Sequence, residues 1–129
     1  MNERLYRILL ADDDAAQLDL RKQLLEIAGY QVDIAFNAPQ AFQRLQSHPP
    51  NLVITDLRLP HENDESDARE GLALIRRIRE IGSPIPILVL SGWPNDIYGQ
   101  PEEQLVSRVL LKPVKTRELL HTIQELLTL

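Results

Sequence analysis

The chain has 129 residues, of which 43% are hydrophobic and 26% charged, an ordinary composition for one globular domain spanning 1–129. The net charge of −5 argues against a direct nucleic-acid surface, and the absence of cysteine excludes disulfides and thiolate metal sites. No apolar run reaches the length of a membrane span, and the first residues lack a secretion signal, so a cytoplasmic location is expected.

Five short apolar runs predict β-strands. They are Arg7–Ala11, Gln31–Ala35, Leu52–Thr55, Ile85–Leu90 and Val109–Leu111. Four of them are almost continuously apolar, which is typical of parallel strands covered on both faces. The exception, Gln31–Ala35, alternates apolar and polar residues and is predicted at an edge of the sheet.

The segments between these runs show the apolar spacing of helices. The stripes are Leu20, Leu24 and Ile27; Ala41, Phe42 and Leu45; Leu74, Ile78 and Ile81; a short, weaker helix over Glu102–Ser107; and Leu119, Ile123, Leu126 and Leu127. Asn37 and Thr116 are predicted N-caps, and Gly29 and Gly82 are predicted to end helices. Five βα units in this order favour an α/β fold with a doubly wound, five-stranded parallel sheet.

One segment, His61–Glu70, interrupts this rhythm with five acidic residues, one arginine and no large apolar residue. Such a composition is typical of a solvated loop. It would also suit an insertion beside a functional site that shapes the choice of partner. The sequence leaves both interpretations open.

Polar residues stand at the ends of four predicted strands. In chain order they are Asp12, Asp13 and Asp14; Thr55 and Asp56; Ser91 and Gly92; and Lys112 and Pro113. Sites in open α/β sheets form at the carboxyl ends of the strands, so three carboxylates, a hydroxyl and an ammonium should converge there. Clustered carboxylates repel one another, and a hard cation such as Mg²⁺ would relieve this repulsion.

Each of these residues has an ordinary structural alternative. The aspartate triplet could cap the following helix, and Asp14 is expected to do so. Asp56 and Ser91 could be turn residues, and Lys112 could be a solvated lysine. Their joint placement at four strand ends favours a site.

Four motifs resemble those of response-regulator receiver domains of the chemotaxis-regulator type, along essentially the whole chain. They are Ile8–Asp14, Asn51–Pro60 with a proline four residues after Asp56, Leu88–Gly92 and Leu110–Pro113. Their order is similar to that of the family, as are the separations of 35 residues from Asp56 to Ser91 and 21 from Ser91 to Lys112. The resemblance implies a flavodoxin-like (βα)5 receiver fold.

The resemblance also implies a phosphorelay role. Asp56 would accept a phosphoryl group from the phosphohistidine of a sensor histidine kinase or of a histidine phosphotransfer protein. Asp13, Asp56 and the backbone carbonyl of Arg58 would hold Mg²⁺, while Asp12 would act mainly through water. The chain would be a signalling protein rather than an enzyme, although it would catalyse its own phosphorylation and slow dephosphorylation. Its output partner is not identified by the sequence, and the family allows a phosphorylation-linked dimer.

The remaining implied roles fall on Lys112 and Ser91, which would contact oxygens of the phosphoryl group. The chain departs from the family in its longer loop before Gly71 and in Val109, which stands where a switching aromatic residue is frequent. Because valine is small and stiff, Gly92–Pro94 is the predicted reporter of a movement of Ser91.

Two other functions remain open from the sequence. Phosphatases with an aspartyl nucleophile usually carry a second acid two residues later, where Arg58 stands here. A receiver-like interaction module would have lost phosphorylation, although the acceptor, its acidic neighbours, the hydroxyl and the lysine are all present. The chain would be a stand-alone receiver or part of a longer protein.

Overall fold

The computed structural model describes residues 5–60 and 67–128. Its strands are β1 (Arg7–Ala11), β2 (Gln31–Ala35), β3 (Leu52–Asp56), β4 (Ile87–Ser91) and β5 (Arg108–Leu111). Its helices are α1 (Ala15–Ile27), α2 (Ala38–Ser47), α3 (Arg69–Glu80) and α4 (Thr116–Leu127), with the 3₁₀ helices η1 (Pro94–Asp96) and η2 (Pro101–Leu105).

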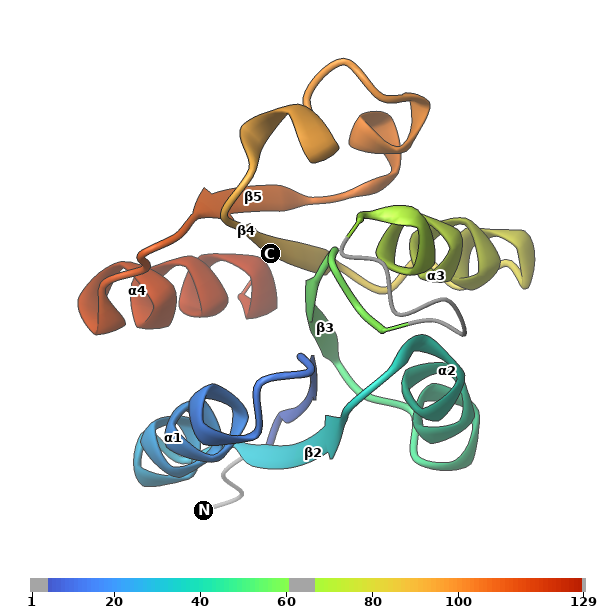
Figure 1. The fold of residues 1–129 in the computed structure, drawn as a ribbon. Coiled ribbons are helices and arrows are strands. Elements are labelled where there is room, and N and C mark those ends of the chain that lie inside the picture. The colour runs from blue at the N-terminus through green and yellow to red at the C-terminus, as the bar shows by residue number, and fades with distance from the viewer. Residues whose placement is uncertain (1–4, 61–66, 129) are drawn as a thin grey trace.

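The five strands form one parallel sheet in the order β2-β1-β3-β4-β5 (Figure 1). This confirms the predicted fold class and the edge position of β2. The other edge is β5, which was predicted to be covered on both faces. Its residues are instead half-buried or exposed, because it has only one neighbouring strand.

Successive strand residues point to opposite faces, so each strand contributes to two hydrophobic cores. Leu9 and Val53 pack with α2 and α3 on one face, while Leu10 and Ile54 pack with α1 and α4 on the other. Figure 1 shows the two helix pairs on opposite sides of the sheet. This double cover explains why the central strands are almost continuously apolar.

The first helix turns a different face to the sheet from the one predicted. Leu18 and Leu25 are buried, whereas Leu20 and Ile27 of the predicted stripe are 53% and 84% exposed. Apolar residues lie on more than one side of α1, so their spacing does not define a single buried face. The buried positions place Arg21 on the side of α1 that faces the sheet.

The connection between β4 and β5, all of which is described, forms η1 and η2 rather than the α-helix of the fourth βα unit. Pro94, Gly99 with φ of +86°, and Pro101 interrupt helical hydrogen bonding within a few residues. Glu102, predicted to begin a short helix, lies within η2, is buried and pairs with Arg76 of α3. The connection therefore lies against α3 and contains two short 3₁₀ helices in place of an α-helix.

The remaining helix ends follow the predictions with small differences. Asn37 caps α2, and Gly29 and Gly82 follow α1 and α3 with positive φ angles, as predicted. Thr116 is the first residue of α4 rather than its cap, since Lys115 occupies the cap position. Ile81 is 50% exposed because α3 ends before it.

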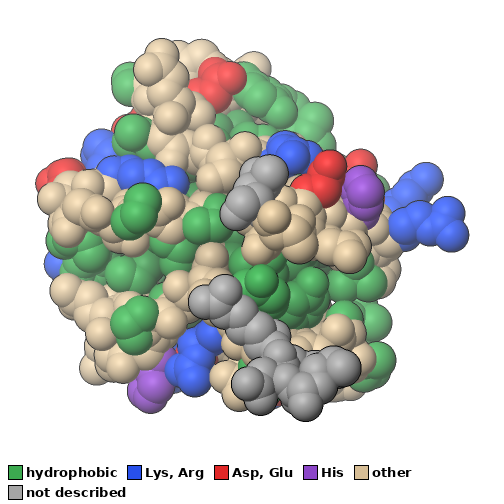
Figure 2. Space-filling view, turned by 180° about the vertical axis from the view of Figure 1, so that it is seen from behind, with side chains coloured by type: hydrophobic (Ala, Val, Ile, Leu, Met, Phe, Trp, Pro, Cys, Tyr) green, Lys and Arg blue, Asp and Glu red, His purple; other side chains and the backbone are tan. Residues whose placement is uncertain are grey.

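Figure 2 turns the molecule by 180° and shows hydrophobic side chains gathered across the middle of the opposite face. Within the described ranges, no helix is both long and apolar enough to cross a membrane. The functional candidates lie at the carboxyl ends of the strands.

Candidate functional site

Three carboxylates meet at the carboxyl ends of β1 and β3. Asp12 and Asp13 follow β1, and Asp56 is the last residue of β3. One ligand oxygen from each lies within 4.8 Å of the others. Hard oxygen donors at this spacing suit a divalent cation such as Mg²⁺.

Asp56 is held by its neighbours on both carboxylate oxygens. The backbone N–H of Leu57 donates to Oδ1 at 2.8 Å, and Lys112 Nζ lies 2.9 Å from Oδ2. Asp56 is buried, with 7% of the residue exposed. The Lys112 N–H donates to the Ser91 carbonyl at 2.8 Å, and the Lys112–Pro113 peptide bond is cis.

Asp12 is even more enclosed, and both of its carboxylate oxygens accept hydrogen bonds. The backbone N–H of Asp14 donates to Oδ1 at 3.0 Å, and Arg21 Nη1 donates to Oδ2 at 3.0 Å. Lys112 Nζ lies 3.8 Å from the same Oδ2. Asp12 therefore sits between two cations supplied by the protein.

Sequence reasoning missed Arg21. The signal was present, since Leu18, Arg21 and Leu25 follow a helical spacing of three and four residues that places them on one face. A charged residue within a buried stripe implies a buried partner of opposite charge. The competing apolar residues of α1 obscured that stripe.

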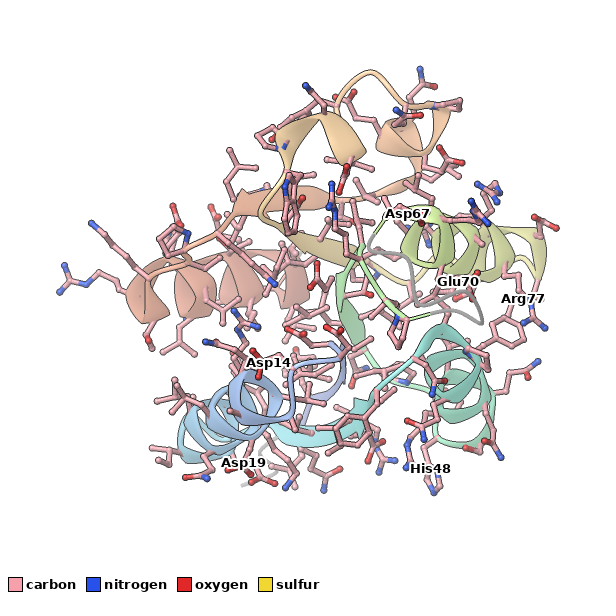
Figure 3. All side chains as sticks on the ribbon, in the orientation of Figure 1. Asp14, Asp19, His48, Asp67, Glu70 and Arg77 are labelled. Carbon is pink, nitrogen blue, oxygen red and sulfur yellow. The ribbon has the colours of Figure 1, made fainter. Side chains whose placement is uncertain are left out.

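Asp13 differs from the other two carboxylates because its side chain is exposed. Partial desolvation is the largest cause that raises the pKa of Asp13 above its usual value, and the negative charges of Asp12 and Asp56 raise it further. Asp14 turns away from this cluster and caps α1, as predicted, by accepting the N–H groups of Ala16 and Gln17. Figure 3 shows Asp14 at the start of α1.

Ser91 ends β4, one residue beyond Leu90, which is paired with Asp56 in the sheet. Its buried hydroxyl donates to the Trp93 carbonyl at 2.9 Å and accepts the Trp93 N–H at 3.1 Å. Both hydrogen bonds of the Ser91 hydroxyl are therefore made to the backbone of the turn that follows β4.

The side chain of Arg58 leaves the carboxylate cluster and joins the turn after β4. Its Nε donates to Asp96 Oδ2 at 2.9 Å, and its guanidinium carbon lies 3.6 Å from the centroid of the Trp93 ring. The hydrogen bond to Asp96 is the largest cause that raises the pKa of Arg58, so this group stays charged. The Arg58 carbonyl, expected to be a metal ligand, remains a prediction.

An open cavity of about 550 Å³ adjoins the site between α1 and the segment after β5. It is lined by Asp14, Gln17, Arg21, Lys112, Pro113 and Val114. Val109 is half-buried against the core that contains α2 and α3. Of the acidic segment His61–Glu70, residues 61–66 lie outside the described residues, so both interpretations of it stay untested.

Comparison with known proteins agrees with this geometry. The family model described as response regulator receiver domain matches residues 8–124. The chain is 33% identical over 125 residues to the response regulator receiver protein CpdR of Brucella abortus, covering 94% of this chain and 96% of the relative. It is 36% identical over 96 residues to the virulence transcriptional regulatory protein PhoP of Salmonella typhimurium, where it covers 72% of this chain but only 40% of that protein.

A solved CheY-like receiver domain from Methylobacillus flagellatus superposes with a TM-score of 0.80 at 28% identity, covering 95% of this chain and 99% of that one. Receiver domains of two-component response regulators are signalling domains, generally not classed as enzymes. The sequence motifs, the fold and the match along residues 8–124 together show that this chain belongs to the response regulator receiver family.

Proposed function

We propose that this receiver takes a phosphoryl group onto Asp56 from the phosphohistidine of a sensor histidine kinase or histidine phosphotransfer protein. The reaction depends on Mg²⁺, and the modified chain changes conformation to regulate an output partner. Because histidine kinases use ATP, the proposal places the protein in the cytoplasm. A phosphorylation-linked dimer is part of the same proposal.

The observation that carries the proposal is the environment of the Asp56 carboxylate. Leu57 N–H fixes one oxygen, and Lys112 lies 2.9 Å from the other, so the carboxylate has a defined orientation. In the transfer, an Asp56 oxygen forms a bond to phosphorus while the bond from phosphorus to the donor imidazole nitrogen breaks. Lys112, a compact cation, would contact a phosphoryl oxygen and offset its negative charge.

The donor set supports a metal role for Asp13 and Asp56. Bound Mg²⁺ would offset negative charge on the transferring phosphoryl group. The exposed Asp13 carboxylate is open to a cation, whereas both Asp12 oxygens accept hydrogen bonds from the protein. This difference between the two aspartates after β1 supports Asp13 as a direct ligand and Asp12 as a group acting through water. The two oxygens of Asp56 are also hydrogen-bonded, so its metal role rests on its place in the carboxylate cluster.

The Arg58 side chain argues against the phosphatase alternative. The position two residues after Asp56, where such phosphatases carry an acid, holds a cation paired with Asp96. No acidic group is therefore supplied by that residue to protonate a leaving group.

The proposal is tested by mass spectrometry after incubation with a small phosphodonor and Mg²⁺. The parent should gain one phosphoryl group, whereas Asp56→Asn should gain none, because an amide is not a nucleophile for this reaction. Asp33→Asn, on the edge strand β2, is the matched control and should label like the parent. Equal labelling of Asp56→Asn would refute the acceptor assignment, and an unlabelled parent would favour the interaction-module alternative.

A further inference from the structure

Arg21 brings a second positive charge to the acidic site. Its side chain is 13% exposed and pairs at 3.0 Å with Asp12, whose own side chain is 5% exposed. Lys112 supplies the other cation, 2.9 Å from Asp56 and 3.8 Å from Asp12. Three carboxylates thus face two fixed cations, so that much of their negative charge is already offset within the protein.

The position of Arg21 is set by the packing of α1. Leu18 and Leu25 are buried against the sheet, and Arg21 lies between them on the same side of the helix. From this position its guanidinium reaches Asp12, which directly follows β1. The side chain also lines the open cavity beside the site, so the packing does not enclose it completely.

We propose that Arg21 is a positioning residue that acts as an internal counter-ion for Asp12 and thereby weakens the binding of Mg²⁺ at the site. This inference rests on the metal role in the proposed function. The Arg21 guanidinium pairs directly with Asp12, a member of the acidic cluster, and from this position it repels a divalent cation. Arg21 also donates a hydrogen bond to Asp12 Oδ2, so Asp13 and Asp56 are left as the direct metal ligands.

A purely structural role for Arg21 predicts the opposite effect. If the arginine served only to hold Asp12 in place for the metal, its removal would loosen the site and weaken Mg²⁺ binding. An internal counter-ion predicts tighter binding when its charge is removed. The sign of the change therefore separates the two roles.

The test is a calorimetric titration of the unphosphorylated protein with Mg²⁺ at low ionic strength. Arg21→Gln should bind Mg²⁺ about three- to tenfold more tightly than the parent. This is the size expected for the Coulomb repulsion between a guanidinium and a divalent cation that share a neighbouring carboxylate. Arg21→Lys keeps the charge and should stay close to the parent. Lys22→Gln makes the same change of net charge at the next residue, where the lysine pairs with the exposed Glu26, and should change the affinity much less.

Unchanged or weaker Mg²⁺ binding by Arg21→Gln would overturn the inference while leaving the proposed phosphorylation intact. Absence of Mg²⁺ binding by the parent would overturn the metal role and this inference together. If thermal unfolding shows that Arg21→Gln is not cooperatively folded, Arg21→Leu replaces it, because leucine continues the apolar stripe between Leu18 and Leu25. Arg21→Leu should then show the same increase in Mg²⁺ affinity over the parent.

Discussion

The guanidinium of Arg58 lies over the indole of Trp93 and pairs with Asp96, so a residue after β3 is joined to the turn after β4. Arg58 and Trp93 each stand two residues beyond a site residue, Asp56 and Ser91 respectively. We call Arg58, Trp93 and Asp96 the stacked clamp. The cation–π contact of Arg58 with Trp93 adds to the attraction between Arg58 and Asp96, whose side chains are only 22% and 16% exposed.

Because of the stacked clamp, we expect the phosphoryl group to be lost slowly from Asp56. Hydrolysis needs a water oriented toward phosphorus, and neither Arg58 nor Trp93 offers a carboxylate or amide that could orient one. The half-life of the phosphorylated parent should be minutes to hours, and Asp96→Ala should shorten it severalfold by releasing Arg58. The measurement is the decay of the phosphorylated mass with time.

Asp33→Ala is the matched control for this prediction, because it removes an aspartate of the edge strand β2 from another arginine pair, with Arg7 of β1. Its half-life should equal that of the parent. A parent half-life of a few seconds, or no effect of Asp96→Ala, would contradict the slow hydrolysis attributed to the stacked clamp.

At the scale of elements, the turn after β4 is the first segment that a movement of Ser91 would disturb. The hydroxyl forms hydrogen bonds with the N–H and the carbonyl of Trp93, and turning toward a phosphoryl group would cost at least one of them. A bound group shifts a conformational equilibrium only through contacts that differ between the two states. The two hydrogen bonds to Trp93 are such contacts.

Trp93, the sole tryptophan, should therefore report the change by its fluorescence. Beryllofluoride with Mg²⁺ should alter the emission of the parent and of Val109→Ala, but not of Asp56→Asn, which lacks the acceptor. Ser91→Ala should bind the analogue with a much smaller emission change. If Val109→Ala binds the analogue but loses the response, the signal runs through β5 and the turn after β4 is not the reporter.

The start of α3 packs so closely on the end of β3 that only glycine fits there. A Cβ atom added to Gly71 would overlap Cα and the carbonyl oxygen of Leu57, and the Gly71 N–H donates to that carbonyl at 3.1 Å. Gly71→Ala should lower the free energy of unfolding by about 2 kcal/mol or more, a typical cost of forced overpacking. Chemical denaturation measures it.

Gly92→Ala is the control for this change, since nothing lies within 4 Å of an added Cβ there. It should change the free energy of unfolding by about 0.5 kcal/mol or less. Equal stability of Gly71→Ala and the parent would show that α3 can move away from Leu57.

Local sequence signals predicted the strands and the parallel sheet, because strands buried on both faces appear as continuous apolar runs. They also predicted the convergence of Asp12, Asp13, Asp56 and Lys112, because these residues directly follow or end such runs. The face of α1 was not predictable in the same way. Leu20 and Ile27 look like core residues by spacing, but only the packing of α1 on the sheet selects Leu18 and Leu25 instead.

The connection through η1 and η2 shows a second limit. The sequence predicted only a short, weaker helix over Glu102–Ser107 here, and the partners that fix the path of the connection lie far away in the sequence. Arg79 of α3 donates to the carbonyl of Leu105 at 3.0 Å, and Arg76 pairs with Glu102. Long-range pairs of this kind, like the pair of Arg58 with Asp96, leave no periodic trace in the chain.

For the molecule as a whole, Asp13 is a source of instability before a cation binds, because desolvation and the charges of Asp12 and Asp56 disfavour its ionised form. The pKa of Asp13 is raised above its ordinary value of 3.8, so the folded state holds a proton more tightly than the unfolded state. The stability contributed by protonated Asp13 is present at low pH and is lost as the pH rises from 3.8 through the raised pKa. At neutral pH the ionised carboxylate therefore opposes folding.

Asp13→Asn should accordingly stabilise the metal-free protein at neutral pH, by about 0.5 kcal/mol after allowance for solvent screening of an exposed group. Thermal unfolding should show this gain shrink as the pH falls toward the raised pKa. Adding Mg²⁺ should stabilise the parent more than the variant, because only the parent keeps the Asp13 carboxylate. A variant less stable than the parent without Mg²⁺ would contradict the repulsion.

The pairing of Asp56 with Lys112 spans 56 residues and joins the central strand β3 to the edge strand β5. During synthesis on the ribosome, the acceptor emerges while its lysine is still untranslated. Nascent chains that end before β5 would carry Asp56 without its cation and without the last edge of the sheet. Under the proposed function, competence to accept a phosphoryl group would arise late in translation, and a fragment released before β5 would retain the acceptor without its lysine.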